Sequence, residues 1–245
     1  MKKTFGLLGK DIEYSFSRNY FNQRFEKEGI NAQYINIDLQ NIEELKSVLK
    51  NEKLSGMNVT IPYKEDVIKF VDRLSPVAKA IGAVNVVKFE KDGTLTGYNS
   101  DYYGFKNSLM PLLKEIPKKG LILGTGGASK AIKHTFENLG IEPTFVSRTK
   151  KDGQLTYNEL TEEVFKQNLL IVNSTPVGTF PDVDIAPAIP YQFLTSQHML
   201  FDLVYNPETT AFLKKGIDKG ASVLNGSRML VLQAEESWDI WNELK

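Results

Sequence analysis

The sequence predicts a two-domain α/β protein, and three observations lead to this prediction. Short apolar runs alternate with amphipathic helical patterns along the 245 residues, as in folds whose parallel strands are joined by helices. A glycine-rich turn stands near the middle of the chain, between a predicted strand and a predicted helix. The length is sufficient for one large domain or two modest ones.

The first part of the chain predicts two βα units followed by a hairpin. A helix over residues 19–27 is expected to stop at Gly29, and Asn41 with Glu44 three residues later forms a capping box for the next helix. The pair Asp92-Gly93 between two apolar runs is typical of a hairpin turn. The strands expected in this part span residues 4–8, 33–38, 54–60, 84–89 and 94–98.

The second part predicts a further α/β arrangement and a long final helix. A helix over 128–139 is expected to end at Gly140, one modest helix is expected at about 158–166, and a long helix begins near Met229. The strands expected here span residues 121–123, 143–147, 169–172 and 199–204. We therefore place one domain at residues 1–101, a second at 102–224, and expect residues 225–245 to return to the first.

The composition excludes several classes of function. Lys plus Arg and Asp plus Glu both number 30, and this zero net charge argues against nucleic acid or an anionic membrane as the main partner. Because the chain has no cysteine, disulfides, thiolate catalysis and cysteine-ligated zinc are excluded. The two histidines, His134 and His198, are expected in surface or capping roles, so no metal site is predicted. No apolar run approaches the roughly 18 residues of a membrane span, and a soluble cytoplasmic protein is expected.

The segment Gly124-Thr125-Gly126-Gly127-Ala128-Ser129 follows a predicted strand and opens a predicted helix. A dinucleotide-binding fingerprint has this context: Gly124 would permit the tight turn, and Gly126 would let backbone N–H groups approach the pyrophosphate at the helix N-terminus. Ser129 replaces the third glycine and is small enough for close helix–strand packing. The alternative is a strand-to-helix turn that binds no ligand.

The next predicted strand ends in Ser147-Arg148-Thr149, with no acidic residue before Asp152. An NAD site usually has an acidic side chain here for the ribose 2′-hydroxyl, whereas an arginine suits a 2′-phosphate. The pattern therefore favours NADP, and the alternative is a solvated basic turn.

Four polar segments lie at the ends of predicted strands in the first domain, where open α/β sheets bind ligands. They comprise residues 14–17 with alternating hydroxyls, 56–64, 82–85 and 97–101. Together with the segments above, their order resembles the shikimate dehydrogenase family over nearly the whole chain. The resemblance rests on Ser15-x-Ser17, Asn58-Val59-Thr60-x-Pro62-x-Lys64, Gly82-Ala83-Val84-Asn85, Asn99-Ser100-Asp101, the glycine turn, Ser147-Arg148-Thr149, Asn173-Ser174-Thr175-Pro176-Val177-Gly178, Asp202-Leu203-Val204-Tyr205-Asn206-Pro207 and Met229-Leu230-Val231-x-Gln233-Ala234.

The resemblance implies an N-terminal α/β substrate domain, a Rossmann-like dinucleotide-binding domain and a C-terminal helix that returns to the first. It also implies reversible NADPH-dependent reduction of 3-dehydroshikimate to shikimate, in the biosynthesis of chorismate and the aromatic amino acids. Lys64 and Asp101 would form the catalytic pair, with Lys64 as the preferred proton donor and Asp101 orienting it. Substrate contacts would come from Ser15, Ser17, Thr60, Asn85, Tyr205 and Gln233. Coenzyme contacts would come from Gly124, Thr125, Gly126, Gly127, Ala128, Ser147, Arg148, Thr149, Thr175, Leu203 and Gly226.

Several alternatives stay open at this point. Ser17 is as well suited to capping the first helix as to binding a ligand. Lys64 would open a helix whose dipole disfavours a lysine there, and this misfit favours a functional role for Lys64. The rival functions are a quinate/shikimate dehydrogenase that uses NAD, a non-catalytic dinucleotide-sensing relative, and a sheet-edge interaction module. Arg228 stands where the family has a glycine, and the short segment after Arg148 predicts an open adenine side. A monomer and a homodimer are equally compatible with the sequence.

Overall fold

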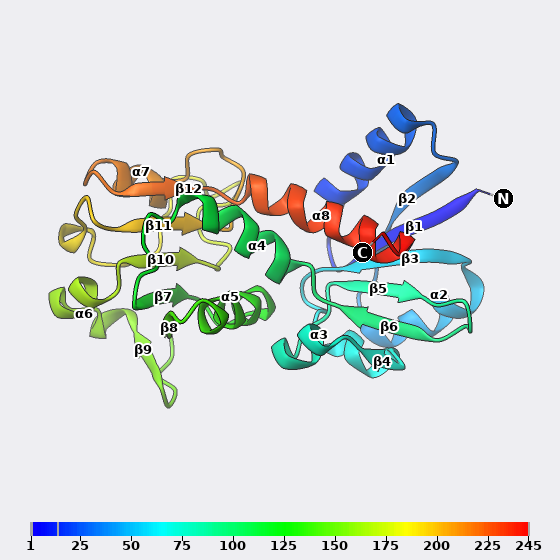
Figure 1. Cartoon of the computed structure of the whole chain (residues 1–245), viewed down its shortest axis with the longest axis horizontal. Helices are drawn as coiled ribbons and strands as arrows, with labels where there is room; N and C mark the ends of the chain where they lie inside the picture. Colours follow the sequence, from blue (N-terminus) through cyan, green and yellow to red (C-terminus); the bar gives the residue numbers. More distant parts are fainter. Residues whose placement is uncertain (1, 14, 245) are drawn as a thin grey trace. The chain divides into compact units, whose positions relative to one another are not determined.

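The structure is a computed structural model that describes residues 2–13 and 15–244, so Tyr14 of the first polar segment lies outside the described residues. The chain forms two compact units, Met1–Tyr103 with Gln233–Lys245, and Gly104–Leu232 (Figure 1). The sequence predicted domain boundaries at 101/102 and 224/225, whereas the units divide at 103/104 and 232/233. Both divisions fall inside continuous helices, α4 (Asp101–Leu109) and α8 (Ser227–Asn242).

The first unit contains a mixed sheet with the strand order β2-β1-β3-β5-β6-β4. Strands β1, β2 and β3 are parallel, and β5 is antiparallel to both β3 and β6. The predicted hairpin is confirmed as β5–β6, and Gly93 adopts a φ of 86° in its turn, which a side chain would disfavour. The strands of this unit are β1 (Lys3–Gly9), β2 (Ala32–Asp38), β3 (Leu54–Val59), β4 (Arg73–Leu74), β5 (Val86–Phe89) and β6 (Leu95–Tyr98).

Helices cover both faces of this sheet because its strands are apolar on both sides. Helix α1 (Phe16–Glu28) and the end of α8 pack on one face through an aromatic cluster that includes Phe21 and Trp238. The other face meets α2 (Leu45–Asn51) and α3 (Pro76–Ile81).

Two local predictions in this unit need correction. The capping box of Asn41 and Glu44 is present, but it caps the 3₁₀ turn η1 (Ile42–Glu44) that leads into α2. Lys64 opens no α-helix: it lies in a run of turns before the 3₁₀ helix η2 (Asp66–Phe70).

The second unit contains a wholly parallel sheet with the strand order β12-β11-β10-β7-β8-β9. Its strands are β7 (Lys119–Leu123), β8 (Glu142–Ser147), β9 (Gln154–Thr156), β10 (Leu170–Asn173), β11 (Met199–Asp202) and β12 (Ser222–Leu224). Strands β9 and β12 and helix α7 (Ala211–Ile217) were not predicted from the sequence. The helix after Arg148 starts later than expected, because a capped 3₁₀ turn, η4 (Tyr157–Glu159), precedes α6 (Glu162–Gln167).

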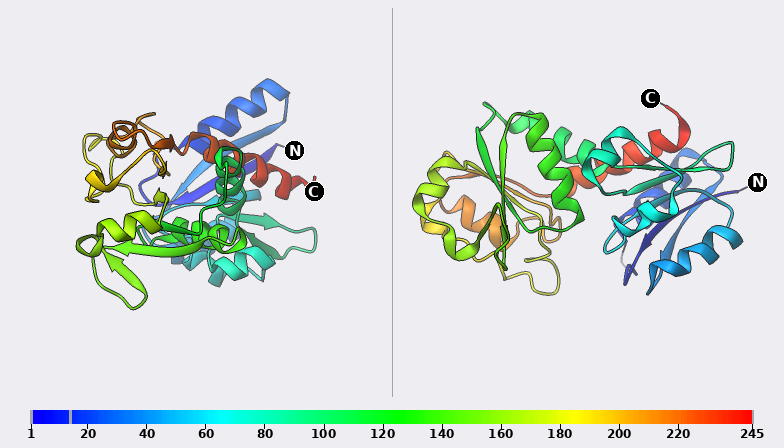
Figure 2. Two further views of the ribbon diagram at one scale, coloured as in Figure 1. Left: turned by 60° about the vertical axis from the view of Figure 1, so that its left-hand side comes forward. Right: turned by 90° about the horizontal axis from the view of Figure 1, so that it is seen from below.

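Alternate residues of the central strands enter two different cores of this unit. Leu121 and Leu123 face α6 and α7, whereas Ile122 between them faces α4 and α5 (Gly127–Asn138). Figure 2 shows α5 on the opposite side of this sheet from α6 and α7. Since parallel strands end at one edge, the turns after β7, β8, β10 and β11 all open at that edge of the second unit, where such sheets bind ligands.

Candidate active site

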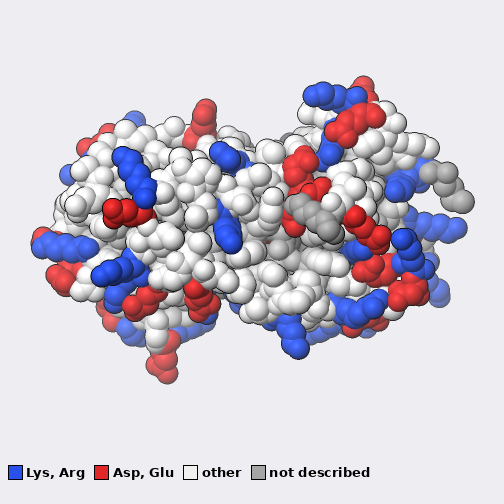
Figure 3. Space-filling view, viewed as in Figure 1, with Lys and Arg blue, Asp and Glu red and all other residues white. Residues whose placement is uncertain are grey.

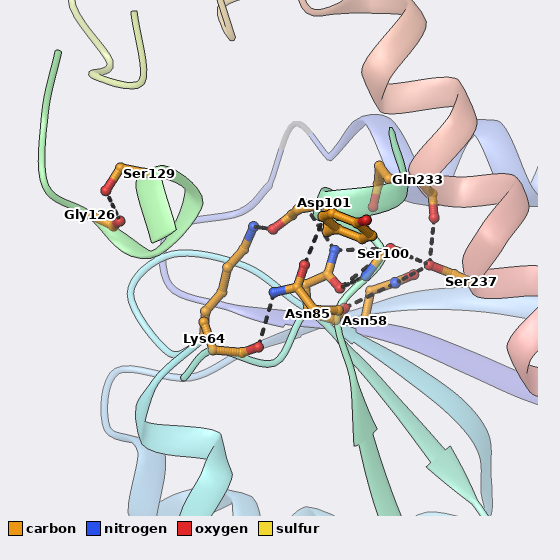
Figure 4. Close-up of polar contacts among 12 residues, drawn as sticks. Asn58, Lys64, Asn85, Ser100, Asp101, Gly126, Ser129, Gln233 and Ser237 are labelled. Atoms are coloured by element: carbon orange, nitrogen blue, oxygen red, sulfur yellow. Dashed lines mark hydrogen bonds and ion pairs between the residues drawn. The ribbon is translucent and has the colours of Figure 1, made fainter. Parts of the chain in front are cut away.

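The predicted catalytic pair is a close, largely buried ion pair in the first unit. Lys64 lies in the turn after β3 and Asp101 is the first residue of α4, and their Nζ and Oδ2 atoms are 2.6 Å apart (Figure 4). The side chains are 14% and 7% exposed, so water screens this pair less than it screens a surface pair. A short contact between an ammonium and a carboxylate holds the amine in one orientation.

Asn85 holds the other oxygen of Asp101. Its Nδ2 donates to Asp101 Oδ1 at 2.9 Å and to Ser100 Oγ at 3.0 Å, while its Oδ1 accepts the Ser100 backbone N–H at 2.7 Å. The backbone also links the two segments, because the Val84 N–H donates to the Lys64 carbonyl at 2.7 Å. The structure therefore brings Lys64, Asn85 and Asp101 together, as the sequence motifs predicted.

The predicted hydroxyl contacts Ser15 and Ser17 are both buried, but only Ser15 caps α1. Ser15 Oγ accepts the Arg18 N–H at 3.2 Å, so the capping role considered for Ser17 belongs to Ser15. Ser17 does not cap the helix because α1 starts at Phe16, three residues before the expected start. Ser17 instead makes a side-chain hydrogen bond with Tyr34, which opposes the strong rise that burial causes in the Tyr34 pKa.

The remaining predicted substrate residues lie in different parts of the chain. Thr60 is half-buried directly after β3, and its N–H donates to the Leu8 carbonyl at 2.8 Å, at the carboxyl end of β1. Gln233 is buried on the part of α8 that belongs to the first unit. Tyr205 belongs to the second unit and is 39% exposed, so its role in substrate binding stays a prediction.

The glycine turn of the second unit has the conformation that a dinucleotide fingerprint needs. Gly124 adopts a φ of 100°, a left-handed conformation that favours glycine. Gly126 is the N-cap of α5, makes no side-chain capping bond and has open space where a Cβ would be. Backbone N–H groups and the helix dipole would thus meet a pyrophosphate here, with Thr125 in the turn and Gly127-Ala128 in the first helical turn.

Two further observations support close packing around this turn. A Cβ on Gly124 would approach Thr175 Cγ2 to 2.8 Å, so the structure brings these two predicted coenzyme residues together. Thr175 is held by its hydroxyl, which donates to Asn173 Oδ1 at 2.6 Å. Ser129 is buried and donates to the Gly126 carbonyl at 2.6 Å, in line with its expected packing role.

Arg148 is exposed after β8 and has no ion-pair partner within residues 2–13 and 15–244. The Ser147 hydroxyl donates to the Thr149 carbonyl and closes the turn on either side of Arg148. The neighbouring Lys150 forms an ion pair with Glu159, with 2.6 Å between Nζ and Oε1, so the carboxylate balances its positive charge. The exposed guanidinium of Arg148 is suited to a phosphate. The open adenine side stays a prediction, and the sheet continues after Arg148 with β9, which was not expected there.

Leu203 and Gly226, both predicted to line the coenzyme site, are in direct contact. A Cβ on Gly226 would lie 2.2 Å from the Leu203 carbonyl oxygen, so this position requires glycine for packing alone. Asp202 before Leu203 is fully buried, and burial raises its pKa to about 6. Arg228, expected from the resemblance to stand in place of a glycine, is exposed at the start of α8.

Neither histidine is among the predicted site residues. His134 is half-buried on α5. His198 was expected at the surface or in a cap, but it is buried: its Nδ1 accepts the Thr195 N–H at 3.0 Å and its Nε2 lies 3.1 Å from the Phe165 carbonyl. Burial lowers its pKa, so the ring is neutral and pins the loop before β11 to α6.

The structure also reveals a site residue that the motifs did not include. Ser237 on α8 is fully buried and contacts both Asn58 and Ser100. It stands four residues after Gln233, which places both on one face of the helix, and this spacing was the only signal in the sequence.

Charged side chains of both signs are mixed over the visible surface (Figure 3). On the face shown in Figure 3, Lys and Arg side chains are interspersed with Asp and Glu side chains in both units. Within the described residues no cluster of three or more His, Asp or Glu side chains could hold a metal ion. No helix in that part of the chain is long and apolar enough to cross a membrane.

Comparison with known proteins identifies the family. Residues 7–87 match the family model described as the shikimate dehydrogenase substrate binding domain. The chain is 38% identical to the shikimate dehydrogenase (NADP(+)) of Methanococcus maripaludis over 261 residues, covering 99% of this chain and 92% of that protein. It superimposes on the shikimate dehydrogenase 1 structure from Peptoclostridium difficile with a TM-score of 0.86 and 37% identity, covering 99% and 92% of the two chains. The structure of a Thermus thermophilus shikimate 5-dehydrogenase in complex with NADP(H) and shikimate gives a TM-score of 0.86 at 29% identity, covering 98% and 94% of the two chains. The two-unit fold, the buried lysine–aspartate pair and the glycine turn agree with these matches. The chain belongs to the shikimate dehydrogenase family.

Proposed function

We propose that the chain is a shikimate dehydrogenase, which reduces 3-dehydroshikimate reversibly to shikimate with NADPH, in the biosynthesis of chorismate and the aromatic amino acids. The observation that carries the proposal is the buried Lys64–Asp101 pair, with 2.6 Å between Nζ and Oδ2. Two comparisons support it: the Methanococcus maripaludis relative is NADP(+)-dependent by name, and the Thermus thermophilus structure, which covers 98% of this chain, holds NADP(H) and shikimate.

The residues of the first unit suit the reduction of a ketone to an alcohol. The bound coenzyme would supply the hydride to the carbonyl carbon. The carbonyl oxygen then gains negative charge, and the Lys64 ammonium donates the proton that completes the hydroxyl. Asp101 accepts a second N–H of Lys64 and holds the ammonium in place, while Asn85 holds Asp101. In the reverse direction the neutral amine of Lys64 accepts the hydroxyl proton and becomes the ammonium again.

The hydrogen bonds of the first unit suggest which serine binds the substrate carboxylate. Ser15 Oγ accepts the Arg18 N–H, so its own hydroxyl hydrogen can donate to a carboxylate. The Ser17 hydroxyl bonds to Tyr34 and would have to turn away to do the same. We therefore assign the first contact to Ser15, with Ser17, Thr60, Asn85, Tyr205 and Gln233 as the other proposed substrate residues.

The coenzyme is proposed to bind the strand-end edge of the second unit. Backbone groups of the turn from Gly124 to Ala128 would hold the pyrophosphate, and the open space at Gly126 fits such an approach. Arg148 would pair with the 2′-phosphate, flanked by Ser147 and Thr149. The other proposed contacts are Thr125, Thr175, Leu203 and Gly226.

The test is the absorbance of the reduced nicotinamide after mixing the purified protein with shikimate or quinate and with NADP or NAD. We expect shikimate-dependent reduction of NADP, with strong loss in Lys64→Ala and Asp101→Ala. Equal rates with quinate and NAD would instead support the broader dehydrogenase, and a folded protein inactive with every pair would refute the proposal. A Lys64→Met variant that lowers only substrate affinity would refute the role of Lys64 as proton donor.

The place of action in the cell and the state of assembly are part of the same proposal. A cytoplasmic place of action follows from the biosynthetic reaction proposed. The state of assembly, monomer or homodimer, would be measured by light scattering on the purified chain.

A further inference from the structure

Ser237 on α8 is fully buried beside the catalytic segment of the first unit. Three polar atoms surround its Oγ: the backbone carbonyl oxygen of Gln233 at 2.8 Å, Asn58 Nδ2 at 2.9 Å and Ser100 Oγ at 3.2 Å (Figure 4). A serine hydroxyl has one hydrogen to donate and two lone pairs that accept. Three neighbours therefore use its full hydrogen-bonding capacity.

The chemistry of the neighbours determines which atom donates. The backbone carbonyl oxygen of Gln233 can only accept, so the Ser237 hydroxyl donates its hydrogen to it. Asn58 Nδ2 can only donate, so it donates to Ser237 Oγ. The second lone pair of Ser237 is then left for the Ser100 hydroxyl, which becomes the donor in that contact.

The direction of the hydrogen bond from Ser100 to Ser237 determines how Ser100 contacts Asn85, and Asn85 in turn contacts the catalytic aspartate. With its hydrogen committed to Ser237, Ser100 Oγ accepts one N–H of Asn85 at 3.0 Å. The second N–H of Asn85 donates to Asp101 Oδ1 at 2.9 Å, which leaves Oδ2 for Lys64. A flipped Asn85 amide would place its oxygen against the carboxylate, so the order of donors fixes one orientation of the amide.

The Ser237 hydroxyl is also held by Asn58 on β3, and Asn58 makes two further hydrogen bonds. Asn58 Oδ1 accepts the Tyr34 hydroxyl hydrogen at 2.8 Å, and Asn58 Nδ2 donates to the backbone carbonyl oxygen of Asn85 at 3.2 Å. Asn58 therefore cannot exchange its oxygen and nitrogen without losing these bonds. Ser237 is the point where this buried arrangement on β3 meets the chain of bonds that leads to Asp101.

We infer that Ser237 is a positioning residue for catalysis: it directs the Ser100 hydroxyl so that Asn85 holds Asp101, and thereby Lys64, in the productive orientation. Without Ser237 Oγ, the Ser100 hydroxyl would turn to Asn85 Oδ1, which lies 3.3 Å away and already accepts the Ser100 N–H. The amide would then be held less firmly toward Asp101. The inference rests on the proposed dehydrogenase function.

The experiment measures steady-state shikimate oxidation with NADP for the wild type, Ser237→Ala, Ser100→Ala and the double variant. Ser108→Ala is the matched control, because Ser108 is also fully buried and donates to a backbone carbonyl of its own helix, Phe105 at 2.9 Å, but lies in the second unit. We expect Ser237→Ala to lower kcat about threefold to tenfold, the effect of one buried hydrogen bond, while KM for shikimate stays nearly constant. In the Ser100→Ala background the same change should have no further effect, because the link is already broken.

Each outcome decides a different point. An unchanged kcat in folded Ser237→Ala, an equal loss in the Ser100→Ala background, or the same loss in Ser108→Ala would overturn the inference. If Ser237→Ala does not fold, Ser237→Cys replaces the hydroxyl by a thiol of similar size that is a much weaker donor and acceptor, so a loss of kcat is expected there too and a wild-type kcat would overturn the inference. A wild type without shikimate-dependent reduction of NADP would refute the proposed function itself, whereas an active wild type with an unaffected Ser237→Ala refutes only the positioning role.

Discussion

Replacing Asp202 by asparagine should change how the stability of the protein depends on pH. Asp202 is fully buried at the end of β11, and this burial raises the pKa of its carboxyl from 3.8 to about 6. Hydrogen bonds from Thr210 at 2.6 Å, Asn173 at 2.9 Å and the Val204 N–H at 3.0 Å favour the charged form but do not outweigh burial.

The sign follows from the order of the two pKa values. Because the pKa in the folded state lies above the value of 3.8 in the unfolded chain, the folded protein binds the proton more tightly between them. Below about pH 4 both states are protonated and the group has no cost. As the pH rises through that window, ionisation favours the unfolded chain, and the free energy of unfolding falls by about 3 kcal/mol, at 1.36 kcal/mol per pKa unit.

The assay is urea unfolding of the wild type and Asp202→Asn from about pH 4 to pH 8. The asparagine removes the titration, so the wild type should lose stability relative to the variant as the pH rises and level off above about pH 7. Asp92→Asn is the control without a trend over most of this range, because hydrogen bonds from Thr94 lower the pKa of the exposed Asp92, so its carboxyl is ionised in both the folded and the unfolded chain well above pH 4. A flat difference between wild type and Asp202→Asn, or one that grows in favour of the wild type, would refute the reasoning.

Three other substitutions test the coenzyme side and the second core. Arg148→Ala should raise KM for NADP about tenfold or more and leave KM for NAD unchanged, because only NADP carries the phosphate; equal changes for both would contradict this role. Gly226→Ala should lower the melting temperature and the affinity for NADP together, since its Cβ would meet the Leu203 carbonyl oxygen at 2.2 Å; a stable variant with normal coenzyme binding would contradict the packing argument. His198→Ala should destabilise the second unit by about 1–3 kcal/mol without altering kcat, as measured by urea unfolding and steady-state kinetics, because the buried Thr195 N–H and Phe165 carbonyl lose their partner.

The predictable parts of the fold are those whose hydrophobic pattern is strong. The central strands β7 and β10 are apolar on both faces and were predicted within one or two residues at each end. The edge strands β9 and β12 have three residues each, none of them fully buried, so their sequences carry no distinct pattern. Helix α1 was started too late, because its first turn, beginning at Phe16, follows a buried serine cap that was interpreted as a ligand contact.

Some residues of the candidate site could also be predicted from the sequence and one could not, for a different physical reason. Lys64, Asn85 and Asp101 stand next to strand ends, and a local pattern is enough to bring such residues to one edge of a sheet. Ser237 depends instead on which face of α8 meets β3 and the start of α4, and no local pattern specifies a contact between residues 137 positions apart in the chain. The requirement becomes visible only when donors and acceptors are counted around one buried oxygen: Gln233 must accept, Asn58 must donate, and the remaining lone pair can direct only Ser100. A hydroxyl at position 237 is therefore needed by its surroundings rather than by the substrate, so the substrate-binding motifs do not include it.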